Sequence, residues 1–487
     1  MEARKSVVLV FDVGSSGMKG FLYNKNGICI GKSQYLYSMK IDGQAATQKA
    51  EDFENGVQNN SRNLLKYAKE AGCSIEAIVF TSQRSSLVCL SEKGHVLTDF
   101  IMWYDKRSQD ICNTRKETLK DSHYQICGID PSPILLAPKI TWVKENMKDV
   151  AKKTVKYVSI QDFLIYRATG KFVTDPTLAC RTGLMEIHTM YWSEEMLDCY
   201  GIHKKELCDI IPTGSIAGKV TREFSGMTGL PEGIPVITAG GDQQCSVHGQ
   251  GIDESAIGVT LGSGGYAVGI SSTLALAAED KIDVCASSVS GWWNLEKSIP
   301  SVGTSYDWCR RNFYGEECIQ EEFNKKLELS EPGAGGVIAY TDFTKRDKSG
   351  GSKALMNIGL STSREDMARA FVESVVDDMA ESCLLLKKRL VKINKVLVTG
   401  GMSKSDLINQ MLADMLDIPV IKNRIDEATA DGAWLLAAKE LGMYSVGIEN
   451  DRRKALQEKE YIPNKFCVER YAVNRLERRK IFEKESM

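Results

Sequence analysis

The sequence lacks the long apolar runs and the charge imbalance that mark several protein classes. No apolar run approaches the roughly 20 residues that a membrane helix needs, and residues 1–6 do not have the pattern of a signal peptide. The net charge is −2, and the one basic cluster, RLERRK at 475–480, is interpreted as a solvated helix face. We therefore expect a cytoplasmic protein that binds neither nucleic acid nor a membrane.

Paired cysteines and closely spaced histidines are also missing. The fourteen cysteines include no CxxC, and they are scattered along the chain. The five histidines show no metal-ligand spacing. We expect reduced, mostly buried thiols rather than disulfides or a metal site.

What remains is an ordinary globular composition, with 43% apolar and 26% charged residues. A chain of 487 residues exceeds what one hydrophobic core usually supports, so two domains are expected.

Residues 7–24, VVLVFDVGSSGMKGFLYN, have the pattern of a β-hairpin with a polar tip. An apolar run leads into Asp12, a GSSG turn follows at 14–17, and a second apolar run comes next. The turn N–H groups and serine hydroxyls can form a concave donor array for phosphate oxygens. Asp12 could hold the Mg²⁺ that accompanies a nucleotide. The alternative is an ordinary Gly/Ser turn.

A similar stretch occurs again in the second half of the chain. Residues 256–272, AIGVTLGSGGYAVGISS, place a Gly/Ser turn at 262–265 between two apolar runs. Two such hairpins indicate two related lobes whose tips converge on one polyanionic ligand. A chance pair of turns is the alternative.

A polar break interrupts two apolar runs in IEAIVFTSQRSSLVCL, residues 75–90. Gln83 and Arg84 in this break could face a substrate, or they could belong to a plain turn. Shortly after, Trp103 could stack on a sugar face with Asp105 or Arg107 binding hydroxyls, or it could be a core residue beside a solvated charge cluster. A helix and a polar loop further on carry Gln161, Asp162, Asp175 and Arg181.

Two later segments place a glycine pair after a strand. In GIPVITAGGDQQ, Asp242 follows Gly240-Gly241 and opens a helix, where it would be ionised, exposed and able to accept a proton, or would only cap the helix. In KVLVTGGMSKSDL, Gly400-Gly401 allow a close approach to a nucleoside at a helix start, or form a generic turn.

The order of eight pieces resembles the FGGY carbohydrate kinases, the family of glycerol kinase and xylulokinase. The pieces are FDVGSSGMKG, WYDKRS, APKITWVKEN, HTMYWSEEML, GGDQQ, LGSGGY, VTGGMSKSDL and EATADGAWLLAA, within residues 7–445. The resemblance implies an α/β fold with two actin/hexokinase-like, ribonuclease H-like lobes and an interlobe catalytic cleft. It implies a sugar-binding lobe at 1–247, a nucleotide-binding lobe at 248–450 and a helical tail at 451–487. The implied reaction transfers the γ-phosphoryl group of ATP, with Mg²⁺, to a sugar or polyol hydroxyl.

The same resemblance implies roles for single residues. Asp242 would be the catalytic base, and Asp12 and Asp242 would be the Mg²⁺ ligands. The phosphate and Mg²⁺ region would contain Asp12, Gly14, Ser15, Ser16 and Lys19. The nucleotide would contact Gly262, Ser263, Gly264, Gly400, Gly401 and Ser403. The sugar would contact Gln83, Arg84, Trp103, Asp242 and Gln243.

Departures from the relatives bear on the acceptor. Glycerol kinases have Arg-Glu where this chain has Arg84-Ser85, and Ile134 and Leu135 replace an expected aromatic pair, so a ketose or longer polyol, with a pentulose favoured, is expected instead. Xylulokinases have Met-His where this chain has Gln83-Arg84. A polyol, a sugar acid or glycerol therefore remains an alternative acceptor. An actin/Hsp70-like nucleotide switch and a catalytically silent sugar-binding regulator are the non-enzyme alternatives. Whether the protein is a homodimer is left open.

Overall fold

The computed structural model describes residues 5–276, 278–299, 301–340, 354–443, 452 and 455–485. The chain divides into two compact units. The first unit is built from Met1–Gly251, Ser271–Asn294 and Asp426–Arg452, and the second from Ile252–Ile270, Leu295–Ile425 and Arg453–Met487. Each unit therefore combines separate stretches of chain, whereas the lobes predicted at 1–247 and 248–450 are continuous. Those lobe boundaries stay a prediction.

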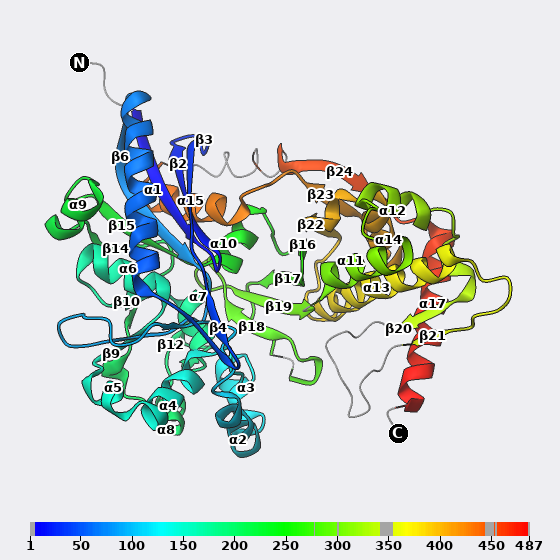
Figure 1. Cartoon of the computed structure of the whole chain (residues 1–487), viewed down its shortest axis with the longest axis horizontal. Helices are drawn as coiled ribbons and strands as arrows, with labels where there is room; N and C mark the ends of the chain where they lie inside the picture. Colours follow the sequence, from blue (N-terminus) through cyan, green and yellow to red (C-terminus); the bar gives the residue numbers. More distant parts are fainter. Residues whose placement is uncertain are drawn as a thin grey trace. The chain divides into compact units, whose positions relative to one another are not determined.

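The first unit is organised around a six-stranded sheet with the order β14-β15-β6-β1-β2-β3 (Figure 1). Its strands are β1 Lys5–Val13, β2 Gly17–Asn24, β3 Cys29–Leu36, β6 Cys73–Ser82, β14 Ile216–Lys219 and β15 Pro235–Gly241. β1 and β2 form the predicted antiparallel hairpin, and β1, β6 and β15 run parallel. The shorter strands are β4 Lys40–Asp42, β5 Ala45–Gln48, β7 Val88–Leu90, β8 Phe100–Ile101, β9 Lys156–Val158, β10 Val173–Thr174, β11 Met185–Glu186, β12 Tyr191–Trp192, β13 Asp209–Ile210 and β18 Asp283–Ala286.

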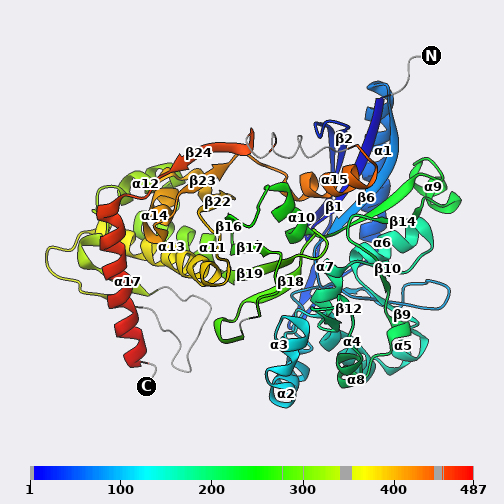
Figure 2. The same ribbon diagram turned by 180° about the vertical axis from the view of Figure 1, so that it is seen from behind.

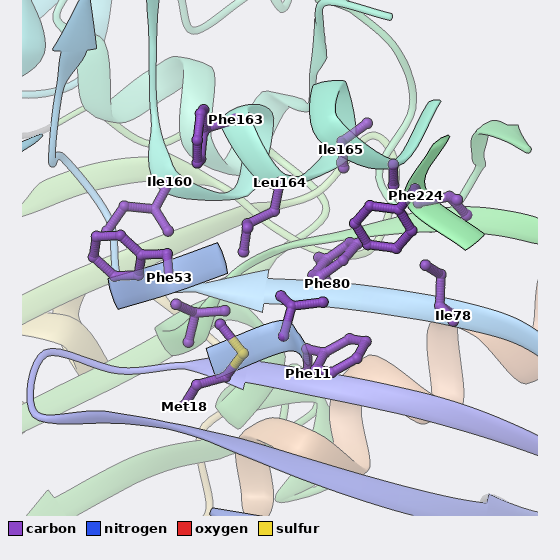
Figure 3. Packing of buried hydrophobic residues seen from close by; sticks show 14 of the residues in the cluster. Phe11, Met18, Phe53, Ile78, Phe80, Ile160, Phe163, Leu164, Ile165 and Phe224 are labelled. Atoms are coloured by element: carbon purple, nitrogen blue, oxygen red, sulfur yellow. The ribbon is translucent and has the colours of Figure 1, made fainter. Parts of the chain in front are cut away.

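Helices bury both faces of this sheet. The helices of the unit are α1 Ala50–Glu70, α2 Gln109–Leu119, α3 Ser122–Cys127, α4 Leu136–Asn146, α5 Lys148–Lys153, α6 Ile160–Thr169, α7 Pro176–Ala179, α8 Glu194–Tyr200, α9 Arg222–Thr228, α10 Asp242–Gly249 and α15 Ala428–Glu440. Phe11 of β1 stacks on Phe80 of β6 at 5.1 Å between ring centroids, on the face covered by α1 and α6 (Figure 3). Val8 and Val10 point to the other face, against α15. Burial on both faces explains why the run at 7–11 is uninterruptedly apolar.

Two glycines let α10 and α15 touch. A Cβ on Gly249 would lie 1.9 Å from the Ala428 carbonyl oxygen, and a Cβ on Gly432 would lie 1.9 Å from the Cys245 carbonyl oxygen. The helices therefore contact each other backbone to backbone, which a larger side chain at either position would prevent. This contact anchors α10, the helix that begins with Asp242.

The second unit repeats the central arrangement of the first. β16 is antiparallel to β17 and parallel to β22, as β1 is to β2 and β6, and its sheet continues in the order β19-β17-β16-β22-β23-β24 (Figure 2). The strands are β16 Ala256–Leu261, β17 Gly265–Ser271, β19 Trp293–Ile299, β20 Ile338–Tyr340, β21 Ala354–Met356, β22 Lys395–Thr399, β23 Val420–Asn423 and β24 Gln457–Tyr461. The helices are α11 Val302–Tyr314, α12 Gln320–Leu327, α13 Arg364–Arg389, α14 Asp406–Leu416 and α17 Lys465–Glu485.

The C-terminal segment differs from its sequence prediction in two respects. Besides the predicted helix it contributes β24, which pairs with β23 at the edge of the sheet. The predicted solvated face is correct for residues 476, 477, 479 and 480 of RLERRK, which are exposed. It is wrong for Arg475 and Arg478, which are largely buried and both bond to Asp377 of α13, at 2.6 and 2.9 Å. The cluster fastens α17 to the second unit.

Two expectations from composition can be compared with the fold. All fourteen cysteines are free, and all but Cys29, Cys199 and Cys467 are buried, as predicted. None of the helices in the described ranges is long and apolar enough to cross a bilayer.

Candidate active site

Asp12 and Asp242 lie at the same edge of the first unit's sheet. Asp12 is the penultimate residue of β1 and pairs with Thr81 of β6, and Asp242 directly follows β15, whose last residue pairs with Ser82 of β6. Burial, the charge of Asp242 and, more weakly, that of Glu427 raise the pKa of Asp12 to about 7, while Lys19 opposes the rise. The two carboxylates are therefore within electrostatic reach of each other.

Lys19 faces Asp12 across the hairpin and forms an ion pair with Glu427 at 2.9 Å. Its side chain is 42% exposed, so it reaches the solvent while paired with Glu427. Ser16 at the tip of the hairpin is exposed as well. These two residues remain candidates for phosphate contacts.

The hairpin tip is bonded directly to the predicted sugar residues. The Ser15 hydroxyl donates to Gln83 Oε1 at 2.8 Å and accepts from the Trp103 indole N–H at 3.1 Å. Gln83 Nε2 and the Tyr37 hydroxyl both donate to the Gly14 carbonyl, at 3.3 and 2.6 Å. The structure thus brings the phosphate and sugar candidates together. A phosphate contact of Ser15 would come from its backbone N–H, because its hydroxyl is already bonded on both sides.

Arg84 lies over the glycine that precedes Asp242. A Cβ on Gly241 would be 2.8 Å from both Cγ and Cδ of Arg84, so only glycine leaves room for this side chain. The guanidinium donates to Gln244 Oε1 at 3.4 Å. Gln244 is buried in α10 and was not predicted, whereas the predicted Gln243 is partly exposed and its N–H bonds to Asp242 Oδ1 at 2.8 Å. Asp242 is the first helical residue rather than the cap, which is Gly241.

Lys139 forms a hydrogen bond with the backbone of Ser85, the residue after Arg84. Ser85 has φ +70°, a conformation that costs energy for a residue other than glycine. The buried Lys139 ammonium donates to the Ser85 carbonyl and to the Ile134 carbonyl, both at 2.7 Å. The Ser85 hydroxyl donates to the Arg181 carbonyl at 3.4 Å. The sequence signal for Lys139 was a lone lysine in the apolar stretch LLAPKITWV, which can be recognised only in retrospect.

Asp105 and Arg107 make structural contacts. Asp105 is 1% exposed, accepts the Ala46 N–H at 2.8 Å and pairs with Arg107 at 2.8 Å. The Arg107 guanidinium lies over the Trp142 ring at 4.4 Å. The cluster is therefore not solvated at Asp105, and a contact of either residue with a sugar hydroxyl stays a prediction.

In the second unit, the predicted nucleotide hairpin rests on the start of α11. The Gly262 N–H donates to the Gly264 carbonyl at 3.0 Å and closes the tip. The Gly303 N–H donates to the carbonyls of Gly262 and Ser263, at 3.0 and 3.1 Å. A Cβ on Gly303 would lie 2.3 Å from the Gly262 oxygen, so this glycine, which the sequence did not single out, is required for the contact.

The glycine pair after β22 lies beside the same hairpin. Gly400 has φ +97°, and a Cβ there would be 2.6 Å from the Leu261 carbonyl oxygen. Gly401 has open space around it. The Ser403 hydroxyl donates to the Gly400 carbonyl at 2.7 Å, in a 3₁₀ turn at 402–404. The prediction that the pair lies at a helix start needs correction, because α14 begins only at Asp406.

The donors near Asp12 suit Mg²⁺ in the presence of phosphates. Within the described part of the chain, no group of three or more His, Cys, Asp and Glu could hold a metal by itself. Mg²⁺ is usually bound by one or two carboxylates together with phosphate oxygens and water. Asp12 and Asp242 supply such a pair, and their mutual repulsion would be relieved by a cation.

Comparisons with known proteins agree with this fold. Residues 7–249 match the N-terminal domain and residues 260–441 the C-terminal domain of the FGGY family of carbohydrate kinases. The chain is 24% identical to xylulose kinase of Staphylococcus xylosus, over 88% of this chain and 90% of that one. It is 25% identical to gluconokinase of Bacillus licheniformis, over 91% of this chain and 88% of that one. In structure it is similar to a ligand-bound xylulose kinase from Lactobacillus acidophilus, with TM-score 0.91, 22% identity and coverage of 99% and 98%. The chain therefore belongs to the FGGY family of carbohydrate kinases.

Proposed function

We propose that the protein phosphorylates a ketose or polyol hydroxyl from MgATP, with Asp242 as the general base. The observation that carries the proposal is the pair of carboxylates, Asp12 and Asp242, at the ends of parallel strands beside Arg84. Ligands of open α/β sheets bind at the carboxyl ends of the strands. A carboxylate at the start of a helix is also kept ionised by the helix dipole.

Each residue would contribute positioning or charge. The hydroxyl oxygen of the acceptor would attack the γ-phosphorus of ATP while Asp242 accepts the hydroxyl proton. Arg84 would orient the acceptor by donating hydrogen bonds to the acceptor's oxygens. Lys19 would place a positive charge near the transferred phosphoryl group. Mg²⁺, held by Asp12 with Asp242 as a second oxygen donor, would neutralise phosphate charge when bound. In the second unit, Gly262, Ser263, Gly264 and Gly401 would contact the nucleotide.

The acceptor is proposed to be larger than glycerol. The side chain after Arg84 is a serine instead of an acid, and it is 2% exposed with its hydroxyl turned to the Arg181 carbonyl. That position therefore offers a bound sugar no carboxylate. A five- or six-carbon ketose or polyol, with a pentulose favoured, has more hydroxyls for Arg84 to bind and a longer carbon face to stack on Trp103, whose indole N–H is already bonded to Ser15. The similarity to xylulose kinases supports this choice, and the similarity to gluconokinase keeps a sugar acid in the comparison.

Replacing the base tests the proposal. Asp242→Asn keeps the shape of the side chain and removes its ability to take a proton. We expect kcat to fall by about 10²- to 10⁴-fold while MgATP binding, measured by calorimetry, stays close to normal. A matched control is Asp110→Asn, which changes an exposed acid in the first turn of α2 in the same unit. Normal turnover of Asp242→Asn would overturn the assignment.

A further inference from the structure

The backbone that leads to Asp242 is irregular. Thr238 of β15 pairs with Phe80, but the register shifts before Gly240, which pairs with Thr81. Such a bulge breaks the regular ladder of strand hydrogen bonds and re-aims the residues that follow. Gly240 also has φ +85°, which a residue with a side chain rarely adopts. Other groups must therefore fix the direction of the chain at this point.

Three side chains from three elements bond to this irregular turn. Gln161 Oε1 of α6 accepts the Gly240 N–H at 2.8 Å, and Thr177 Oγ1 of α7 accepts the Gly241 N–H at 2.9 Å. The Thr81 hydroxyl of β6 donates to the Gly240 carbonyl at 2.9 Å. Both N–H groups and the carbonyl of the turn are thus held from different directions.

Asp175 joins these side chains into one cluster. Its Oδ2 accepts from Gln161 Nε2 at 2.8 Å and from the Thr238 hydroxyl at 2.6 Å. Its Oδ1 accepts from the N–H and the hydroxyl of Thr177, at 3.0 and 2.5 Å. Each of these four residues is 0% exposed. A buried carboxylate with this many donors forms charge-assisted bonds, so the orientations of Gln161 and Thr177 are strongly determined.

The cluster closes tightly on the turn. A Cβ on Gly240 would lie 2.1 Å from Thr177 Oγ1 and 2.9 Å from Asp175 Oδ1. Asp175 also caps α7 through the Thr177 N–H. Capping alone would not require the bonds to the N–H groups of Gly240 and Gly241, which come immediately before the proposed base.

We propose that Asp175, Gln161 and Thr177 are positioning residues for phosphoryl transfer, which fix the Gly240-Gly241 turn and thereby the direction of the Asp242 carboxylate. The inference rests on the proposed role of Asp242 as base. A displacement of a reacting group by about 1 Å can cost on the order of 10² in rate. The cluster therefore acts on kcat, through a residue that it does not itself touch.

Thr177 offers the sharpest test, because its variants separate the hydroxyl from the shape. Thr177→Val removes the acceptor of the Gly241 N–H, and Thr177→Ser keeps it. The control is Thr228→Val in α9, where a buried threonine hydroxyl likewise accepts a backbone N–H, of Leu230 at 3.2 Å, and donates to the Phe224 carbonyl at 2.7 Å. For Thr177→Val we expect kcat to fall by about 10- to 100-fold with an unchanged KM for MgATP. Thr177→Ser should recover most of kcat, and Thr228→Val should lower only the melting temperature.

Combination with Asp242→Asn distinguishes this inference from the proposed function. If the cluster acts through the base, Thr177→Val should lower the residual kcat of Asp242→Asn little further. An equal loss in both backgrounds, or a kcat loss no larger than that of Thr228→Val, would overturn the inference and leave the base intact. Full activity of Asp242→Asn would overturn the base itself.

A second variant covers the case in which Thr177→Val does not fold. Thr81→Val removes the donor to the Gly240 carbonyl from a strand position, where valine is favoured. We expect the same selective loss of kcat, with recovery in Thr81→Ser. A folded Thr81→Val with unchanged kcat would count against the proposal.

Discussion

Lys139 is a buried lysine. It is 1% exposed, and burial lowers its pKa to about 7, although the nearby Asp105 opposes the shift. It donates to the carbonyls of Ser85, which follows Arg84 of the candidate site, and of Ile134. A lysine of this kind links the protonation of the protein to its stability.

The sign of this linkage can be predicted. In the unfolded chain Lys139 keeps its proton up to about its usual pKa of 10.5, whereas in the fold it loses the proton near 7. The unfolded state thus binds more protons between these values, and the free energy of unfolding rises with pH there, by at most about 1.4 kcal/mol per pH unit. Below pH 7 this group adds no pH dependence. Denaturant unfolding should show that the free energy of unfolding of the wild type rises relative to that of Lys139→Met between pH 7 and 9, because the comparison cancels the contributions of other groups such as Asp12.

A lysine on the same helix provides the control for that experiment. Lys144 pairs with Glu206 at 2.7 Å near the surface, and Lys144→Met should keep the wild-type pH dependence. If the curves for the wild type and Lys139→Met run parallel from pH 7 to 9, Lys139 does not titrate in this range.

At the scale of residues, the sequence singled out candidate site residues where the adjacent sequence has a recognisable pattern. Asp242 follows a glycine pair, Asp12 ends an apolar run two residues before Gly14, and Arg84 lies in a polar break, so local pattern was sufficient to single them out as candidates. Lys139 and Thr177 were not predicted, because each forms a hydrogen bond with a backbone group, a carbonyl or an N–H, that is distant in the sequence. Asp175 was noticed as polar, but nothing in the sequence connects it to Gly240.

The turn between β22 and α14 contains two glycines with different roles, one structural and one proposed to bind the nucleotide. Gly400 is required by the fold, since its φ of +97° and the nearby Leu261 carbonyl leave no place for a side chain. Gly401 has neither restriction, so the protein itself tolerates Gly401→Ala. If Gly401 contacts the nucleotide, as proposed, the added methyl group would crowd the ligand alone. We expect Gly401→Ala to melt like the wild type and to bind MgATP about tenfold more weakly by calorimetry, whereas Gly400→Ala should lose stability.

Gly359→Ala is the matched control, because it too adds a methyl group in open space within the second unit. It should change neither the melting temperature nor the binding of MgATP. Unchanged affinity in Gly401→Ala would remove this residue from the proposed nucleotide contacts.

At the scale of elements, pattern was a good guide where a segment forms its structure locally. Both hairpins lie where their apolar runs and Gly/Ser tips placed them. The edge strand β24 was missed, since its sequence QEKEY is mostly charged and it is a strand only because β23 offers an unpaired edge. The start of α14 was placed too early, because the 3₁₀ turn at 402–404 has the same local signals as a first helical turn.

At the scale of the whole molecule, the assignment of segments to units could not be predicted. α15 lies late in the chain, yet it packs on β1 and α10 of the first unit. Its apolar, alanine-rich sequence is typical of any buried helix and does not indicate which elements the helix packs against. The glycine contacts between α10 and α15 become meaningful only when the two helices are seen together.

The choice of acceptor belongs to the whole molecule, because it depends on Gln83, Arg84, Trp103 and Asp242 acting together. A site built to bind several hydroxyls rejects analogues that lack them by as much as about 10⁴-fold. In a coupled ADP-release screen of ketoses, polyols and sugar acids, we expect kcat/KM for the best five- or six-carbon acceptor to exceed that for glycerol by at least roughly 10²-fold. Arg84→Ala should raise KM for that acceptor more than KM for ATP, and Arg62→Ala, an exposed arginine of α1, should change neither. Should glycerol be the best acceptor, the interpretation of Ser85 fails, although membership of the carbohydrate kinase family does not depend on it.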